Sequence, residues 1–421
     1  MNSATKKLVT TYIALTLFST FAASFIWGIN TLFLLDAGLS ITEAFAANAF
    51  FTAGMMLFEV PTGVIADTAG RRMSYLLGSA TLFISTLLYL LMWQMNGQFW
   101  AWAVVSIFLG LGFTFFSGAT EAWLVDGLNA AKFKGTLESV LAKGEIAEGI
   151  AMLTGTVAGG VIAQYSNLGV PYIARAAMLM MTFVIAFIFM HDAGFKPRRS
   201  AAFGKEIRST FRASLKYGFR NPPVRWLMLS APFAGGIGIF VFYAMQPYLL
   251  QLYGSTDSYS IAGIAAAIVA GAQIVGGFLV PYVGKVFRHR TTILLAGSIA
   301  SVAALALMGL VPNFWVVLGV LTVWSIVFAA TTPIRQSYIN GLIPSEQRAT
   351  VLSSDNLLTS SGGVIFQPAL GKVADIYGYP ASYIMSAAAQ FLALPFLVLA
   401  ARERAPSDEI KGDAAVVPKQ N

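Results

Sequence analysis

The chain has 421 residues, of which 57% are hydrophobic and 11% are charged, and its formal net charge is +8. Its mean hydropathy of +0.70 excludes a soluble domain, because one water-soluble core cannot bury so many apolar side chains. The chain has no cysteine and only two histidines, which excludes disulfides and thiolate metal sites and leaves little for a metal or a cofactor to bind.

Apolar runs of roughly 20 residues recur along the chain, and each is long enough to cross about 30 Å of hydrocarbon as a helix. These runs are continuous and do not alternate with polar residues, which excludes a membrane β-barrel. We therefore predict an all-α membrane protein with about twelve spans. The expected spans are residues 9–35, 44–66, 74–95, 99–125, 139–165, 171–191, 226–251, 259–284, 291–311, 314–338, 352–375 and 380–401.

The basic residues follow the positive-inside rule, by which connections rich in Lys and Arg stay in the cytoplasm. Alternate connections carry bases such as Arg71, Lys132 and Lys285, whereas the connections between them contain no Lys or Arg. We therefore expect a multi-pass protein of the cell membrane with both termini in the cytoplasm. This arrangement accounts for the positive net charge without a nucleic-acid partner.

The connection after the second span reads GVIADTAGRR and concentrates charge between two apolar runs. Gly63 would let its helix approach a neighbour closely, and Gly70 would permit a tight turn. Asp67 could pair with a base or accept hydrogen bonds from a helix N-terminus. Arg71 and Arg72 could bind phosphates or an acid on the fourth span.

This loop, on a chain of about twelve spans, resembles the signature of the major facilitator superfamily. The resemblance implies two six-helix bundles, related by a pseudo-two-fold axis, that rock around a central site. In that family the loop cluster is thought to latch the helices in the state open to the outside. By resemblance, the latch here is Gly63, Asp67, Gly70, Arg71, Arg72 and, on the fourth span, Asp126.

The two sets of six spans resemble each other. FEVPTGVIADTAGRRMSYLLGS aligns with FLVPYVGKVFRHRTTILLAGS, although the second copy has lost the Asp. The basic linker between the sets is expected to contain an amphipathic helix on the inner membrane surface, with a solvated linker as the alternative. The expected parts are an N-terminal bundle, the linker, a C-terminal bundle and a cytoplasmic tail, at residues 1–192, 193–225, 226–402 and 403–421.

The fifth span contains a glycine-rich stretch, from Gly155 to Gly160, that resembles a signature of the family's antiporters. Thr156 stands where that signature has a proline. The fourth span carries Glu121 where proton-coupled drug exporters of the family commonly have an arginine. The glycines thus favour antiport, whereas the two departures weaken the case for exchange of drugs against protons.

Ionisable groups inside the spans are candidates for function, because each costs about 2.5–3.5 kcal/mol on insertion scales. Glu59 lies beside Pro61 on the second span, and Glu121 lies nearer mid-membrane, where it could carry a proton. Arg175, about one turn inside the outer face, is expected to extend its side chain to the membrane surface.

The repeat places opposite charges at equivalent positions of the two halves. Glu121 aligns with Arg335, and Lys143 lies near the equivalent of Asp355. Our hypothesis is that these residues form two ion pairs between the halves and close an inner gate, which protonation or substrate opens. Glu148 would compete for Lys143. The alternative is that these groups lie at helix ends and extend toward water.

In the fold that the resemblance implies, the first, fourth, seventh and tenth spans surround the substrate, and amides from the eighth and eleventh add to the lining. Aromatic and amide side chains suit a moderately apolar organic solute with a few hydrogen-bonding groups. The predicted cavity residues are Trp27, Asn30, Phe240, Tyr243, Gln246, Gln273, Trp324 and Asn356.

These features predict a monomeric secondary transporter for a small molecule, most simply an exporter of a hydrophobic or drug-like compound driven by protons. The chain has no glycine-rich phosphate loop with its lysine, so ATP-driven pumping is not expected. One alternative is a proton-coupled uptake symporter or facilitator for a sugar or other nutrient. An alternative of another class is a membrane receptor or enzyme that transports nothing, although His191 and His289 both lie at the cytoplasmic face and not within the bilayer.

Overall fold

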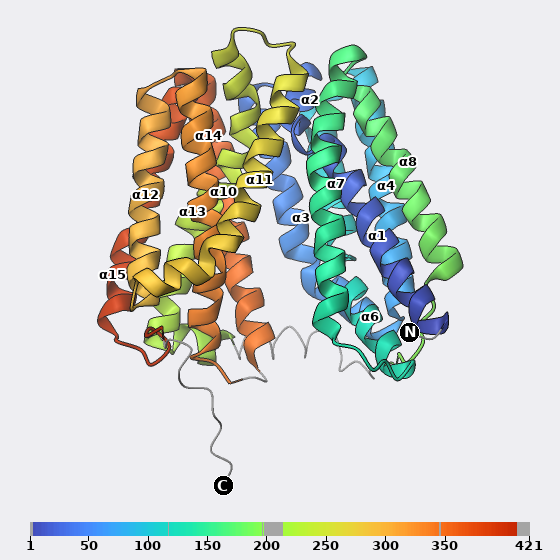
Figure 1. Ribbon diagram of the computed structural model, residues 1–421. Coiled ribbons are helices and arrows are strands. Elements are labelled where there is room, and N and C mark those ends of the chain that lie inside the picture. The colour runs from blue at the N-terminus through green and yellow to red at the C-terminus, as the bar shows by residue number, and fades with distance from the viewer. Residues whose placement is uncertain (1–2, 117, 196, 198–213, 345–346, 411–421) are drawn as a thin grey trace. The chain divides into compact units, whose positions relative to one another are not determined.

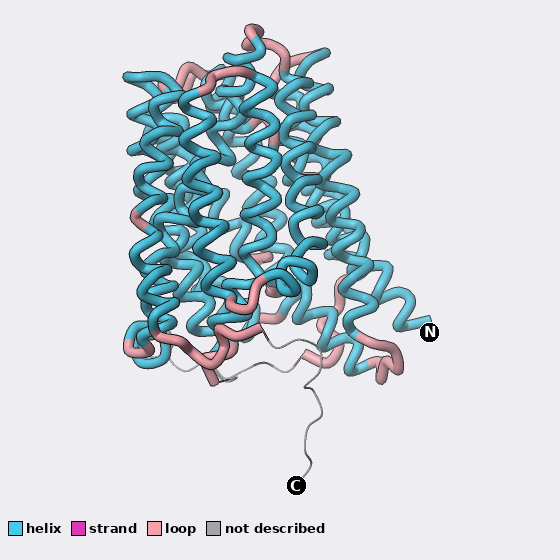
Figure 2. The backbone as a smooth tube through the Cα atoms, turned by 60° about the vertical axis from the view of Figure 1, so that its left-hand side comes forward, coloured by secondary structure: helices cyan, strands magenta, loops and turns pink. Residues whose placement is uncertain are grey.

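The computed structural model describes residues 3–116, 118–195, 197, 214–344 and 347–410. Within these ranges every regular element is helical except an isolated β-bridge between His289 and Glu409 (Figure 2). The predicted all-α fold class is therefore confirmed. Most of the predicted linker helix and the end of the predicted tail lie outside the described residues, and the described part of the linker contains a short π-helix, η1 (Ser214–Phe219).

The helices follow the predicted spans closely, with two breaks and one fusion. The predicted first and fourth spans are each divided into two helices, and one helix covers most of the last two. With the labels of Figure 1, they are α1 (Ser3–Trp27), α2 (Asn30–Asp36), α3 (Ile41–Thr68), α4 (Arg71–Met95), α5 (Phe99–Thr114), α6 (Ala119–Ala130), α7 (Leu137–Tyr165), α8 (Gly169–Phe189), α10 (Pro222–Tyr253), α11 (Tyr259–Val286), α12 (Arg290–Leu310), α13 (Phe314–Asn340), α14 (Arg348–Phe391) and α15 (Ala393–Arg402).

Eleven helical runs among the described residues are long and apolar enough to cross a membrane. The last run, from Thr350 to Arg402, has 53 residues, which is more than twice the length that one span needs. Gly378 interrupts it with a non-helical φ of 82°, between the two spans that the sequence predicts there. The chain can therefore form the twelve predicted spans.

The chain divides into two compact units. The first comprises Met1–Ile207, Phe242–Ile268 and Gln367–Asp375, and the second comprises Arg208–Val241, Val269–Phe366 and Ile376–Asn421. Three helices, α10, α11 and α14, therefore run through both units. The bundle boundaries drawn from the internal repeat stay a prediction, since these units follow spatial contacts and not the repeat.

In the first unit, α1 packs against α7 and α8, and α4 packs against α5 and α8 (Figure 1). The glycine-rich stretch of α7 makes the contact with α1 close. A Cβ on Gly159 would collide with the carbonyl oxygen of Phe25, and one on Gly155 would collide with the Ser24 hydroxyl. Small residues thus serve here the purpose they commonly have between membrane helices.

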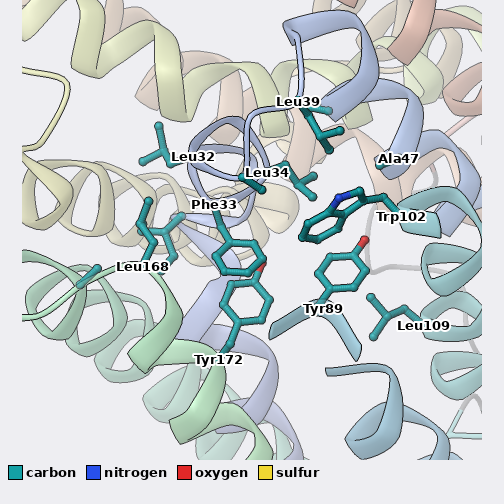
Figure 3. Close-up of a cluster of buried hydrophobic side chains, with 14 of the residues drawn as sticks. Leu32, Phe33, Leu34, Leu39, Ala47, Tyr89, Trp102, Leu109, Leu168 and Tyr172 are labelled. Carbon is teal, nitrogen blue, oxygen red and sulfur yellow. The ribbon is translucent and has the colours of Figure 1, made fainter. Parts of the chain in front are cut away.

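An aromatic cluster holds the short helix α2 in place (Figure 3). The ring of Phe33, on α2, stacks on Tyr172 with centroids 4.0 Å apart and meets Trp102 edge-on at 6.0 Å. Tyr89 packs edge-on against Trp102 at 4.9 Å. Since each such aromatic pair adds about 0.5–1.5 kcal/mol beyond its burial, α2 is anchored although it has only seven residues.

Arg175 does not extend to the membrane surface, so this prediction is wrong. The residue is 2% exposed on α8. Its Nε donates to the hydroxyl of Thr86 and its Nη1 to the carbonyl of Ala22, both at 3.1 Å. Its guanidinium also lies over the Phe113 ring, 5.7 Å from the centroid. Neutral partners on three other helices therefore compensate for its burial.

In the second unit, α12 packs against α13 and α15. The α10 and α14 backbones touch where Gly236 meets Gly362, because neither residue has a side chain to separate them. Leu227, Tyr338 and Val351 belong to the buried apolar cluster nearby. This close packing fixes the parts of α13 and α14 that carry the charged residues described below.

Candidate functional site

The α3–α4 connection is held by an ion pair and a sharp turn. Arg71 Nη1 lies 2.6 Å from Asp67 Oδ1, so the base at the start of α4 pairs with the acid at the end of α3. Gly70, between them, has a φ of 108°, which favours glycine. The turn brings the two charges of this loop together, as their spacing suggests.

The acid that caps α4 is Asp192, which follows α8. Its Oδ1 accepts a hydrogen bond from the Arg72 backbone N–H at 2.9 Å, and a Cβ on Gly70 would collide with its other oxygen. The Arg72 side chain donates to the Phe187 carbonyl at 2.6 Å. A carboxylate at a helix N-terminus satisfies free N–H groups and favours the helix dipole.

Two expectations for this loop are therefore wrong in the structure. Asp126 pairs with neither Arg71 nor Arg72 among the described residues, because those bases are already bound by acids and carbonyls nearer to them. A Cβ on Gly63 would meet no atom within 4 Å, so this glycine mediates no close helix contact here.

The second half repeats the cap with a different acid–base contact, in which His289 Nδ1 lies 3.5 Å from Asp408 Oδ2. Asp408, which follows α15, accepts hydrogen bonds from the Thr291 backbone N–H at 2.8 Å and from the Thr291 hydroxyl at 2.9 Å. The Arg290 side chain donates to the carbonyls of Ser407 and Glu409. In each half, an aspartate that follows the last span thus caps the helix of the third span.

Glu121 and Glu148 line one cavity of about 290 Å³ in the first unit. It lies at the break between α5 and α6, where Gly118 has a φ of 67°. Hydroxyl groups of Tyr12 and Thr16, among others, complete its polar lining. Within the described part of the chain no base pairs with either carboxylate, so the cavity is electronegative.

The remaining charged residues predicted for the first half lie apart from this cavity. Glu59 is half-buried on α3, and its carbonyl accepts one of the two hydrogen bonds of the Thr62 hydroxyl. Lys143 is exposed on α7, one turn from Glu148, and among the described residues it forms no ion pair. The structure therefore brings together two of the predicted coupling residues of this half, Glu121 and Glu148.

Arg335 on α13 and Asp355 on α14 form a bidentate ion pair. Arg335 Nη2 lies 2.7 Å from Asp355 Oδ1 and also donates to the Leu227 carbonyl at 2.7 Å. The predicted pairs, Arg335 with Glu121 and Asp355 with Lys143, are therefore not those of this conformation. The two side chains reach each other because their helices follow one another in the chain and pack side by side.

Gln246 on α10 repairs the break between α1 and α2. In a continuous helix the Trp27 carbonyl would accept a hydrogen bond from the Thr31 N–H. Instead, Gln246 Nε2 donates to Trp27 O at 2.9 Å, and Gln246 Oε1 accepts from Thr31 N at 2.8 Å. Gln246 is only 1% exposed, so its amide takes the place of the missing helical bond away from water.

Thr31 in turn repairs a defect in α10. Pro247 has no N–H, so the Tyr243 carbonyl, four residues earlier, loses its helical donor. The Thr31 hydroxyl donates to that carbonyl at 3.0 Å. The rings of Trp27 and Phe242 pack beside this contact, with centroids 4.4 Å apart. Each helix thus supplies a bond that the other lacks.

The first unit contains two further contacts, which join α3 to α14. The Thr42 hydroxyl donates to Asp375 Oδ2 at 2.7 Å, and Gln367 Nε2 donates to the Thr52 hydroxyl at 3.1 Å. Thr42 and Asp375 are both near the predicted outer face and accessible to solvent.

The other predicted cavity residues are distributed over both units. Asn30 accepts a hydrogen bond from Tyr172 and donates to Asn48, both at 2.9 Å. Phe240 is fully buried, and Trp324 is buried with its ring on Phe328. Gln273 is half-buried on α11.

Asn356 is exposed on α14 and lines a cavity in the second unit. Phe328, the ring partner of Trp324, lines the same cavity.

Several residues of these contacts are absent from the sequence-based prediction. Pro247 lies four residues after Tyr243, a spacing that marks a carbonyl without its helical donor. Asp192 and Asp408 each follow the last helix of a half, and the repeat could have shown that they are equivalent. Thr31 has no such signal, because its role depends on a helix more than 200 residues away.

Comparison with known proteins places these features in a family. The Major Facilitator Superfamily profile matches residues 12–366 and, in a second match, 252–420. No curated protein matches the sequence significantly.

Solved structures with the same fold include transporters of several kinds. The nucleoside transporter NupG has a TM-score of 0.75 at 11% identity, covering 94% of this chain and 99% of that one. A bacterial homologue of the human lysosomal transporter Spinster has a TM-score of 0.73 at 13% identity, covering 96% and 98%. The POT family transporter PepTSo has a TM-score of 0.70 at 11% identity, covering 94% and 98%. At these identities the likeness shows the fold, and together with the profile match it establishes that the chain belongs to the Major Facilitator Superfamily of membrane transporters.

Proposed function

We propose that this transporter exports a small hydrophobic or drug-like compound in exchange for protons. The observation that carries the proposal is the cavity that Glu121 and Glu148 share, because two carboxylates without a basic partner among the described residues form a site for a proton. Its position at a broken helix is typical of coupling sites in secondary transporters. A proton bound there would remove part of the local negative charge.

The proposed cycle is a rocking motion of two bundles around a central site, with both termini in the cytoplasm of a cell and the protein acting as a monomer. The glycine-rich contact of α7 with α1 supports antiport, through the resemblance to that signature. The aromatic side chains near the α1–α2 break, such as Trp27 and Tyr243, support a moderately apolar solute.

The charged residues would act on conformation. The Asp67–Arg71 pair and the Asp192 cap hold the α3–α4 turn, and we assign the latch to them. The Arg335–Asp355 pair would be one of two states of a gate. In the other state Arg335 would pair with Glu121 and Asp355 with Lys143, as the repeat suggests.

Uptake of a polar nutrient is the second candidate. It is favoured by the polar cavity in the second unit, which Arg335, Asp355 and Asn356 line. The similar structures also include one named as a nucleoside transporter and others of the POT family, one of them in complex with a peptide conjugate. A symporter could use the same carboxylates for protons.

Counterflow into proteoliposomes tests the two proposed functions. Radiolabelled chloramphenicol, which is uncharged, represents moderately apolar solutes, and radiolabelled uridine represents neutral polar ones. Export predicts counterflow of the apolar compound, and accumulation when the pH gradient drives protons the opposite way. Counterflow of uridine alone, or accumulation in the same direction as the protons, would support the uptake symporter. If neither probe exchanges, neither assigned substrate class is correct.

A further inference from the structure

The second unit encloses a cavity that no step above requires. Its volume is about 320 Å³, at the lower end of the range for small-molecule sites, and α10, α12, α13, α14 and α15 form its walls. Three exposed polar residues on α13 and α14, which are Thr332, Gln336 and Asn356, form its mouth. The cavity therefore leads from an accessible surface into the interior of the unit.

Two buried polar side chains line this cavity without a partner among the described residues. Gln390 is 5% exposed and Ser298 is 7% exposed, and neither Gln390 Oε1 nor Ser298 Oγ forms a hydrogen bond there. Burying such groups unpaired is unfavourable, and most buried polar groups in proteins have partners. Both residues lie on the cavity wall, and a rotation of either side chain would bring its unbonded oxygen to a solute in the cavity.

The charges of the cavity restrict what could enter. Asp355 is bound by both terminal nitrogens of Arg335, so this wall carries a neutral pair. A charged ligand would have to break the pair or remain without a counterion, and both are unfavourable at a buried site. Leu294, Phe328 and Leu397 make other parts of the wall apolar.

We propose that this cavity binds a small uncharged solute, whose carboxamide or hydroxyl group bonds to Gln390 and Ser298 while its apolar part lies against the remaining walls. The solute would be the transported compound or its polar end, so this part of the inference rests on the proposed function. The ion pair orients the site and selects against ionised compounds.

Three compounds of nearly the same shape test the charge selectivity. Benzamide is neutral, benzoate is an anion and benzamidine is a cation at neutral pH. Binding is measured by titration calorimetry on the full chain purified in detergent. We expect saturable binding of benzamide, with the two ions at least about tenfold weaker. No saturable binding of benzamide, as for a cavity that holds only water, would overturn the proposal, and so would an ion that binds as tightly.

Variants test the contacts. Gln390→Leu should weaken benzamide binding about tenfold without lowering the Tm, because the removed amide oxygen has no protein partner. The control is Gln251→Leu, the same change at an exposed position of α10 outside the cavity, which should leave binding unchanged. Ser298→Ala is the second variant and should weaken binding if Gln390→Leu does not fold. The assignment is wrong if Ser298→Ala binds benzamide as tightly as the unchanged chain and Gln390→Leu, where it folds, does so too.

Binding in detergent requires no transport, which separates the two proposals. Selective benzamide binding in a chain that shows no counterflow would refute the proposed function and leave the site intact. Counterflow of an apolar solute without selective benzamide binding would refute the site alone.

Discussion

The two cavities differ in how their acids are compensated. In the first unit, Glu121 and Glu148 line one cavity and have no basic partner among the described residues. In the second unit, Arg335 forms two hydrogen bonds to the cavity's acid, Asp355. One duplicated helical set has thus produced an electronegative cavity and a neutral one. The difference suggests separate tasks: the first site is suited to bind a cation such as a proton, and the second to bind an uncharged molecule.

The largest expected effect comes from breaking the ion pair. Asp355→Ala would leave the half-buried Arg335 guanidinium without a counterion; breaking a fully buried pair costs about 3–5 kcal/mol, and partial exposure of Arg335 makes the cost here smaller. We expect a marked fall in Tm and loss of counterflow. Thermal unfolding of the purified protein, followed by tryptophan fluorescence, measures the first effect, and proteoliposomes measure the second.

A double variant separates stability from transport in this test. Replacing Arg335 with Met and Asp355 with Leu removes both charges, which is often neutral for stability or favourable. The Tm should recover while counterflow stays absent. Recovery of both would mean that the pair is structural only, and a single variant as stable as the unchanged chain would mean that the pair is not buried as described.

The next largest effect tests whether the cavity in the first unit binds the coupling proton. Glu121→Gln and Glu148→Gln keep the side-chain shape but cannot release a proton. Counterflow should persist, while accumulation driven by a pH gradient falls about a hundredfold, the lower end of the usual effect of removing a proton-transfer group. Glu145→Gln, an exposed neighbour outside the cavity lining, is the matched control. Gradient-driven transport that survives in both variants would remove the proton site from this cavity.

A smaller effect should follow from Gln246→Leu, which removes both hydrogen bonds across the α1–α2 break. Since the chain has no cysteine, Thr42→Cys with Asp375→Cys provides a unique disulfide reporter of the nearby contact. The loss of bonds worth about 1 kcal/mol each should slow cross-linking roughly fivefold to thirtyfold. Gln251→Leu should leave it unchanged. An equal rate in both variants would show that the Gln246 bonds across the α1–α2 break do not stabilise the α3–α14 contact.

The smallest effect compares the two aspartate caps. Asp192→Ala and Asp408→Ala should each cost about 1 kcal/mol, or a few degrees in Tm, because each removes acceptors from the start of a helix. Differential scanning calorimetry measures both. If either variant leaves the Tm unchanged, the two aspartates do not stabilise the two halves in the same way.

The spans were predictable because hydropathy is a local property of the sequence, and twenty apolar residues leave few alternatives to a membrane helix. The breaks within the first and fourth spans were not predictable in this way. The α1–α2 break is stable only because Gln246, far along the chain, replaces the lost bond. Local periodicity contains no sign of such a partner.

The charged sites show the same limit. Aligning the halves identified Arg335 and Asp355 as candidates, but equivalence under a repeat does not establish contact, and the structure pairs them with each other. Arg175 was expected at the membrane surface from its depth alone, whereas Thr86 and the Ala22 carbonyl keep it inside. Glu121 and Glu148, in contrast, line the same cavity, and the coupling role of both stays a prediction.

The reciprocal repair between Thr31 and the Gln246–Pro247 pair has an evolutionary consequence. A relative that regains an N–H at position 247 no longer needs the hydroxyl at position 31, and one with an unbroken first helix has no use for the amide at 246. We expect these three positions to covary among relatives, being retained together or replaced together, although more than 200 residues separate them in the chain.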